Sequence, residues 1–108
     1  MPKYLLSESR DPFETKDVAY YYDLAAGLAR EGNEVTLFLV QNGVLPARAH
    51  ARAEGLAEAA QAGVKALADE FSLRERGIGA GAVAKGVKAA PIDTIIDALA
   101  EGAKALWH

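Results

Sequence analysis

The residues of this sequence that could do chemistry are carboxylates, hydroxyls and basic side chains at the ends of short apolar runs. Asp69 and Glu70 follow one such run, where a strand is expected to meet a helix. An aspartate in that position can cap the helix and favour its dipole, which accounts fully for the residue. Alternatively, the Asp69 carboxylate is a ligand at the mouth of a site, together with Glu8 at the end of the first apolar run.

A small basic cluster made of Arg48, His50 and Arg52 stands near the start of an alanine-rich segment. Positive charge is unfavourable at a helix N-terminus, and a bound anion or an acidic surface on a partner would offset that penalty. The other interpretation is a solvated face without function, because exposed charges commonly have none.

Thiol chemistry is excluded, because the sequence contains no cysteine. That absence removes disulfides, zinc–thiolate sites, thiol nucleophiles and persulfide carriage. Ser7, Ser9 and Ser72 have no nucleophile elbow around them, and neither of the two histidines has an evident orienting partner. No histidine spacing suggests a metal site, and the glycines of residues 79–86 lack the neighbours that a phosphate loop needs. We therefore expect no metal, no cofactor and no recognisable catalytic constellation.

The elements that must position these side chains alternate between strand-like and helix-like apolar periods. Short apolar or β-branched runs predict strands at residues 4–6, 35–40, 64–68, 87–90 and 104–107. Apolar residues three and four apart predict a helix that begins at Asp11 or Thr15 and stops at Gly32, and further helices at 46–62, 69–76 and 92–99. The run at 35–40 is almost continuously apolar, which is typical of a strand buried on both faces.

This alternation predicts one α/β domain over residues 1–108, a three-layer α/β/α arrangement with about five mainly parallel strands. Ligands of such sheets bind beyond the carboxyl ends of the strands. Those ends carry Ser7 and Glu8 in the first loop, Asn42 in the second and Asp69 in the third. A small-molecule or anion-binding module, or a weak enzyme, built on these loops with Arg48 and His50 is therefore one functional hypothesis.

Charge and composition restrict the partners. The chain has 108 residues and a formal net charge of −3, so it lacks the basic excess typical of nucleic-acid binding. Its first apolar run is too short for a signal peptide or a membrane span, which predicts a cytoplasmic protein without membrane contact. Tyr20, Tyr21 and Tyr22 are consecutive, so at least one lies off the core face. Trp107 and His108 add a further surface on which a second copy could pack.

Five segments resemble the DsrE/DsrF-like (YchN-like) family in their order and spacing. They are KYLL at residues 3–6, SRDPF at 9–13, VTLFL at 35–39, QNGV at 41–44 and LRERGI at 73–78, followed by the closing helix and strand. The resemblance extends over essentially the whole chain. It implies a flavodoxin-like sheet of about five parallel strands. It also implies a cytoplasmic homo-oligomer, a trimer or hexamer with a dimer as the smaller alternative.

Active members of that family pass persulfide sulfur between cysteines. The resemblance places their acceptor cysteine at Asp69 and a second cysteine of some members at Ser72. Neither a carboxylate nor a hydroxyl can carry a sulfane sulfur. The resemblance thus implies a non-catalytic or accessory member, an oligomeric binding or structural protein that cannot carry persulfide itself. Its implied partner is a cysteine-bearing sulfur-transfer protein docked at the Asp69 face.

Overall fold

The computed structural model of the chain describes residues 3–48 and 54–108. Five strands form one sheet, and every pairing between neighbouring strands is parallel. The strands are β1 (Lys3–Glu8), β2 (Glu34–Leu39), β3 (Lys65–Asp69), β4 (Val87–Ala90) and β5 (Lys104–Trp107). They lie in the order β4-β3-β2-β1-β5, so β4 and β5 form the two edges. The predicted number and direction of the strands are confirmed.

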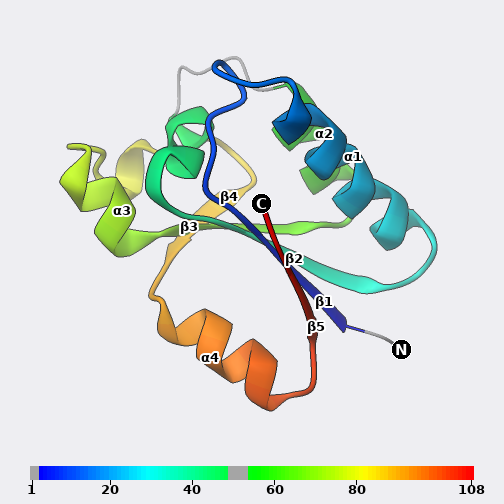
Figure 1. Cartoon of the computed structure of the whole chain (residues 1–108). Coiled ribbons are helices and arrows are strands. Elements are labelled where there is room, and N and C mark those ends of the chain that lie inside the picture. The colour runs from blue at the N-terminus through cyan, green and yellow to red at the C-terminus, as the bar shows by residue number, and fades with distance from the viewer. Residues whose placement is uncertain (1–2, 49–53) are drawn as a thin grey trace.

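Helices cover both faces of this sheet, as the alternation of elements predicts. The helices α1 (Asp17–Arg30) and α2 (Glu54–Gln61) lie together on one face, and α4 (Asp93–Ala100) lies on the other (Figure 1). The short helix α3 (Glu70–Glu75) belongs to the first face, because its Leu73 is buried in the same core as α1 and α2. Among the described residues, no helix combines the length and apolarity needed to cross a membrane. The three-layer α/β/α arrangement is confirmed.

β2 runs through the middle of the sheet, which explains why its residues are almost continuously apolar. Leu37 and Leu39 enter the core on the α1 face, whereas Phe38 and the adjoining Val40 enter the core on the α4 face. All four side chains are buried. A strand covered on both faces reads as a continuous apolar run, because alternate side chains enter two different cores.

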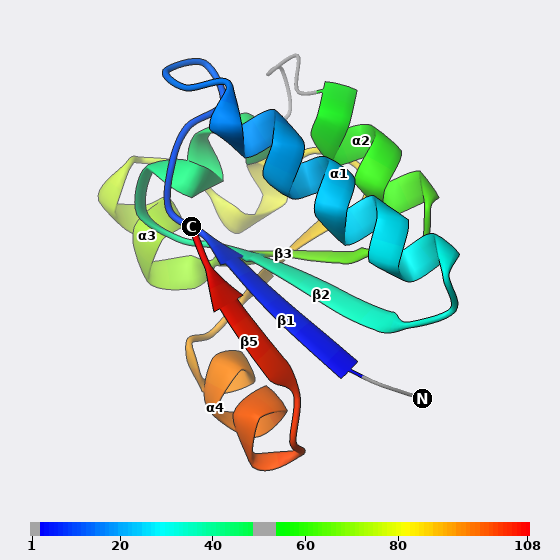
Figure 2. The same cartoon turned by 45° about the vertical axis from the view of Figure 1, so that its right-hand side comes forward.

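The outgoing connections of two neighbouring strands separate at the carboxyl end of the sheet. β3 leads into α3 on the α1 face, whereas β4 leads into α4 on the opposite face. Sheets of this kind bind ligands in the crevice at such a point. From there α4 carries the chain across the sheet to the other edge, which places β5 beside β1 (Figure 2).

The first helix begins later than the sequence predicts. α1 starts at Asp17, and its N-cap residue Lys16 makes no side-chain cap bond. The Thr15 hydroxyl accepts the Asp17 N–H at 3.4 Å, so the later of the two predicted starts lies just before the observed one. The Asp11 carboxylate instead accepts the Phe13 N–H at 3.0 Å and holds a local turn. Aspartate offers such local bonds in competition with helix capping, and here the turn prevails. The predicted stop at Gly32 is confirmed, since this glycine takes a positive φ of 92° after the last turn.

The helix predicted over residues 46–62 is wrong in its first part. The chain forms a 3-10 helix, η1 (Gln41–Ala47), and Arg48 is extended and pairs with Val83 in an isolated bridge. Pro46 lies inside η1. Because proline has no backbone N–H and restricts the residue before it, a regular α-helix is disfavoured there. The start predicted for this helix at residue 46 is therefore wrong, because the alanine-rich composition on which it was based does not take account of Pro46.

Candidate functional site

Asp69 lies at the end of β3 and caps α3. Its Oδ2 atom accepts the Ser72 N–H at 3.1 Å and the Ser72 hydroxyl at 2.8 Å. Both residues are buried, at 7% and 4% exposure. The Ser72 Oγ in turn accepts the Gln41 N–H at 2.8 Å, which ties the end of β2 to α3. The interpretation of Asp69 as a helix cap is confirmed.

A second set of bonds brings three of the predicted site residues into one network. Asn42 accepts the Arg76 Nε–H at 3.1 Å, and the same guanidinium donates from Nη1 to the Ser72 carbonyl at 3.2 Å. Gln41, next to Asn42, has a positive φ of 51°, a region that residues with side chains rarely occupy. Asn42, Asp69 and Ser72 are thus held together where the β2–η1 and β3–α3 junctions meet.

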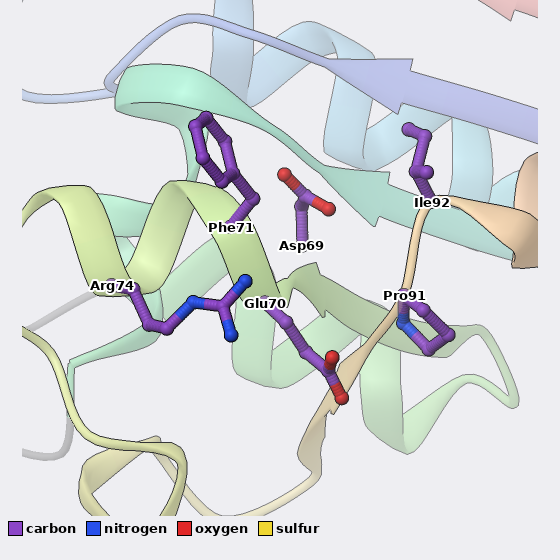
Figure 3. A pocket seen from close by; sticks show the side chains of 6 residues that line it. All are labelled: Asp69, Glu70, Phe71, Arg74, Pro91 and Ile92. Carbon is purple, nitrogen blue, oxygen red and sulfur yellow. The ribbon is translucent and has the colours of Figure 1, made fainter.

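A crevice of about 380 Å³ opens beside Asp69, between the ends of β3 and β4 (Figure 3). This Asp69 crevice is lined by Asp69, Glu70, Phe71, Arg74, Pro91 and Ile92. Phe71 and Ile92 are 59% and 51% exposed, and the Asp69 carboxylate lies between them. The crevice stands where the connections to the two faces separate, and its volume lies in the range of small-ligand sites.

A second hollow of about 290 Å³ adjoins the crevice on the α4 side. It shares Asp69, Phe71 and Ile92 with the crevice, and Trp107 from β5 also lines it. Trp107 is 65% exposed. Together the two depressions form one site with buried polar groups at its base and exposed apolar side chains at its rim.

The remaining predicted residues lie elsewhere. Ser7 and Glu8 are buried at the end of β1 and line neither the crevice nor the hollow. Arg48 is exposed, and its Nε–H is donated to the Leu45 carbonyl at 2.9 Å. Because Arg48 is extended, it does not lie at a helix N-terminus, so the predicted dipole penalty is absent there. His50 and Arg52 lie outside the described residues.

The apolar rim of the site was missed by the sequence analysis. Phe71 lies within the first turn of a short helix, two residues after the capping aspartate. Its place in the sequence therefore already indicated that Phe71 lies close to Asp69. No local pattern, however, indicates that Ile92 and Trp107 approach Phe71. They come from β4–α4 and β5, and the sheet order alone brings these elements near α3.

The prediction that neither histidine has an orienting partner is wrong for His108. Its Nδ1 atom lies 2.8 Å and 3.0 Å from the two carboxylate oxygens of Glu8. Glu8 is 0% exposed, and the His108 ring stacks on Tyr21 with 5.1 Å between ring centroids. Ser7 pairs with Trp107 across β1 and β5, so this register places Glu8 next to His108. Sequence spacing could not show this contact, because the two residues are far apart in the chain.

The pKa values of two tyrosines beside this pair are raised, mainly by burial. Burial, with the Glu8 carboxylate nearby, raises the pKa of Tyr21 to about 12. Burial raises the pKa of Tyr22 further, and Glu8 and Asp11 add to that effect. The Tyr21 hydroxyl donates to the Leu106 carbonyl at 3.0 Å, whereas the buried Tyr22 hydroxyl has no hydrogen-bond partner in the described structure. Within residues 3–48 and 54–108, no three acidic or histidine side chains form a group that could hold a metal ion.

The fold and the position of the site define a class of proteins, the three-layer α/β/α domains with a parallel, flavodoxin-like sheet. No protein-family model and no curated protein sequence matches the chain. Among solved structures, the chain is similar to the ychN protein from E. coli, with a TM-score of 0.89, 16% sequence identity and 100% of both chains covered. It is also similar to MTH1491 from Methanobacterium thermoautotrophicum, a protein of unknown function, with a TM-score of 0.81, 18% identity and 100% coverage of both chains. These likenesses confirm the YchN-like fold that the sequence resemblance implies.

Proposed function

We propose that this chain is a non-catalytic or accessory member of the DsrE/DsrF-like sulfur-relay family, which binds a cysteine-bearing sulfur-transfer protein at the Asp69 crevice. The observation that carries the proposal is the place of Asp69. It caps α3 at the end of β3, the position that the sequence resemblance assigns to the acceptor cysteine. The chain itself has no cysteine, and its fold matches that of the ychN protein over the full length.

The chemistry at Asp69 supports binding rather than sulfur carriage. The N–H and hydroxyl of Ser72 donate to the Asp69 carboxylate, and the same donors would favour a thiolate in that place. Persulfide transfer needs a thiolate that attacks a sulfur atom and then holds it. A carboxylate accepts the same hydrogen bonds but offers no sulfur for the transfer. The sulfur would therefore be carried by the partner.

The rim of the crevice is better suited to a protein surface than to a free anion. Phe71 and Ile92 present exposed apolar side chains, and aromatic anchors of this kind are enriched in protein interfaces. The lining carries the carboxylates of Asp69 and Glu70 against the single guanidinium of Arg74. A small anion would meet unfavourable net charge there, so the anion-binding alternative has less support. Arg74 is the cationic side chain of the lining with which a partner's thiolate could form an ion pair.

The surface formed by α4 and β5 supports a homo-oligomer, with a second copy of this chain as its occupant. Ile96 and Leu99 on α4 are 60% and 50% exposed, and Leu106 on β5 is 45% exposed. β5 is an edge strand whose four residues are all exposed. An edge strand with exposed apolar side chains readily pairs with another strand, so two copies can join across β5. A cytoplasmic trimer or hexamer, or a dimer, is the assembly we propose.

Light scattering tests this assembly. The wild-type chain is expected to form a stable oligomer at micromolar concentration, and Leu106→Lys is expected to shift it toward the monomer. The matched control is Tyr20→Lys on α1, where the replaced side chain is 74% exposed and lies on the other side of the sheet. A wild-type chain that is only monomeric would overturn this part of the proposal.

A gain-of-function variant tests the assignment of Asp69. Asp69→Cys puts a thiol under the Ser72 donors, and we expect it to acquire labelled sulfur from a low-molecular-weight persulfide donor. The wild-type chain is expected to acquire none. Tyr20→Cys is the matched control, because it adds an equally novel thiol on an exposed helix face. If Asp69→Cys takes up no more sulfur than this control, the correspondence with the acceptor position is wrong.

The docking itself is tested by a native pull-down followed by a binding measurement with the purified partner. We expect a cysteine-bearing sulfurtransferase whose binding is weakened at least about fivefold by Phe71→Lys, since the loss of an aromatic anchor costs about 1 kcal/mol or more. Tyr20→Lys is expected to bind normally. A partner without a reactive cysteine, or equal binding by the two variants, would overturn the proposed docking site.

A further inference from the structure

The end of β5 is fixed to β1 by one residue, His108, through contacts of several kinds. Its N–H donates to the Ser7 carbonyl at 2.9 Å, and its carbonyl accepts the Ser9 N–H at 3.2 Å and the Ser9 hydroxyl at 3.0 Å. Its imidazole bonds to Glu8 through Nδ1 and stacks on Tyr21. We call this set of contacts the His108 clasp.

Within the clasp, Glu8 and His108 differ in their access to solvent. The Glu8 side chain is 0% exposed, whereas the His108 side chain is 26% exposed. A buried carboxylate is tolerated only with partners, and here these are the His108 ring and the Arg10 N–H at 3.1 Å. Protons from solvent therefore reach the pair through the imidazole.

Besides the clasp, β5 is held by its pairing with β1 and by the bond from the Tyr21 hydroxyl to the Leu106 carbonyl. β5 lies at the edge of the sheet, pairs only with β1 among the described strands, and all four of its residues are exposed. The helix before it, α4, contains no buried residue. Segments with few buried contacts open most readily, so the clasp contacts decide how firmly the end of β5 stays in place.

The same strand end places Trp107 in the proposed site. Trp107 precedes His108 directly, and the two side chains point to opposite faces of the sheet, as neighbours in a strand do. The His108 ring lies against Tyr21 of α1, whereas Trp107 lines the hollow with Asp69 and Phe71. A single peptide unit therefore separates the His108 clasp from the rim of the site.

We propose that the Glu8–His108 pair is a proton-sensitive clasp that regulates the docking site by fixing Trp107 at its rim. This inference rests on the proposed function for what the site binds. A protonated imidazole forms a charge-assisted bond with the Glu8 carboxylate, and a neutral imidazole donates the same Nδ1–H more weakly. The clasp therefore tightens when His108 gains a proton and loosens when it loses one.

Several other titratable or charged residues around the pair bear on its response near neutrality. They are Tyr21 and Tyr22 on α1, and Arg10 and Asp11 in the loop after β1. Both α1 tyrosines stay protonated there, because their pKa values are raised. Among side chains, imidazole is the one that ordinarily changes charge between about pH 5 and pH 8.

Trp107 is the only tryptophan in the sequence, so its fluorescence reports directly on the clasp. The experiment is acrylamide quenching of the wild-type chain between about pH 5.5 and pH 8. We expect the quenching constant to rise toward the higher pH, because a neutral imidazole holds the Glu8 carboxylate more weakly than a protonated one. His108→Gln keeps an amide near Glu8 but cannot gain a proton, so its quenching should not vary with pH.

The chain supplies a matched control, because it contains one other histidine. His50→Gln is expected to retain the full pH dependence. Glu8→Gln removes the carboxylate and should abolish the dependence as well, and if that buried substitution prevents folding, His108→Gln still decides the question. Quenching that is independent of pH in the wild type, or equally dependent in His108→Gln, would overturn the clasp.

The measurement separates this inference from the proposed function, because it uses the chain without a partner. A pH-dependent Trp107 in a chain that binds no cysteine-bearing protein would leave the clasp standing and overturn the docking proposal. A partner that binds equally well at both pH values to a chain with an unresponsive Trp107 would do the reverse.

Discussion

The two faces of the sheet differ in how they are built. On the α1 face, residues from α1, α2, α3 and η1 join the strands in one extensive core, which includes the large side chains Tyr22, Leu37 and Leu73. On the α4 face, the core among the described residues consists of Leu5, Phe38, Val40, Leu67 and Ala90. The apolar residues of α4 are at best half-buried, and several are exposed.

This difference indicates that one face of the sheet stabilises the fold and the other is available for interactions. Buried apolar area is the main source of stability, so the α1 face holds the domain together. Exposed apolar side chains gathered on one surface mark an interaction site. The α4 face, with the rim of Phe71, Ile92 and Trp107 at its carboxyl end, is therefore the face through which we expect this protein to meet others.

The largest effect is expected from truncating a core residue of the α1 face. Leu37→Ala removes a side chain at 0% exposure and should lower the free energy of unfolding by about 2–5 kcal/mol. Ile96→Ala on α4, where the side chain is 60% exposed, should change it by less than about 0.5 kcal/mol in the monomer. Urea unfolding of both variants measures the contrast, and equal losses would erase the distinction between the faces.

A second test concerns how η1 closes over the α1 face. A Cβ added at Gly43 would collide with the Glu8 carbonyl, so Gly43→Ala forces the backbone apart and should lower the free energy of unfolding by about 1–3 kcal/mol. Gly27→Ala is the control, because nothing lies within 4 Å of its added Cβ on α1. That variant should be more stable by about 0.5–1 kcal/mol. Thermal unfolding shows whether each variant is less stable or more stable than the wild type.

A smaller effect is expected at Asp69, where the two faces meet. Asp69→Ala removes the acceptor of the Ser72 N–H and hydroxyl and should lower the free energy of unfolding by about 1–2 kcal/mol. Asp69→Asn keeps an acceptor oxygen and should recover most of that loss. If the two variants lose the same amount in chemical denaturation, the cap does not stabilise α3.

The smallest effect is expected from alkaline titration of the tyrosines on the α1 face. The folded state holds the Tyr21 proton more tightly than the unfolded chain, since its pKa is raised to about 12. The stability from this group is therefore complete below about pH 10 and is lost as the pH rises toward the folded value. Tyr21→Phe should flatten the fall of the unfolding midpoint above about pH 10, whereas Tyr20→Phe, at the exposed position, should leave it unchanged.

Much of the candidate site was predictable, because caps and loops are local. Asp69 caps α3 as its place after an apolar run predicts, and Asn42 and Ser72 join it where the strand ends meet. Glu8 was expected at the same mouth. It lies instead under η1, because its side chain points to the α1 face, where Gly43 packs against its carbonyl.

The sequence by itself determined the five strands, most of the helices, the parallel arrangement of the strands and the two-sided burial of β2. These features follow from the apolar period within each segment, which depends only on residues close together in the chain. The tertiary structure alone decided the strand order, and with it that β5 lies beside β1 and that His108 meets Glu8. It also decided that Trp107 and Ile92 join Phe71 at one rim. These neighbours depend on where α4 packs. The apolar period within a segment does not determine that, because it reflects only residues close together in the chain.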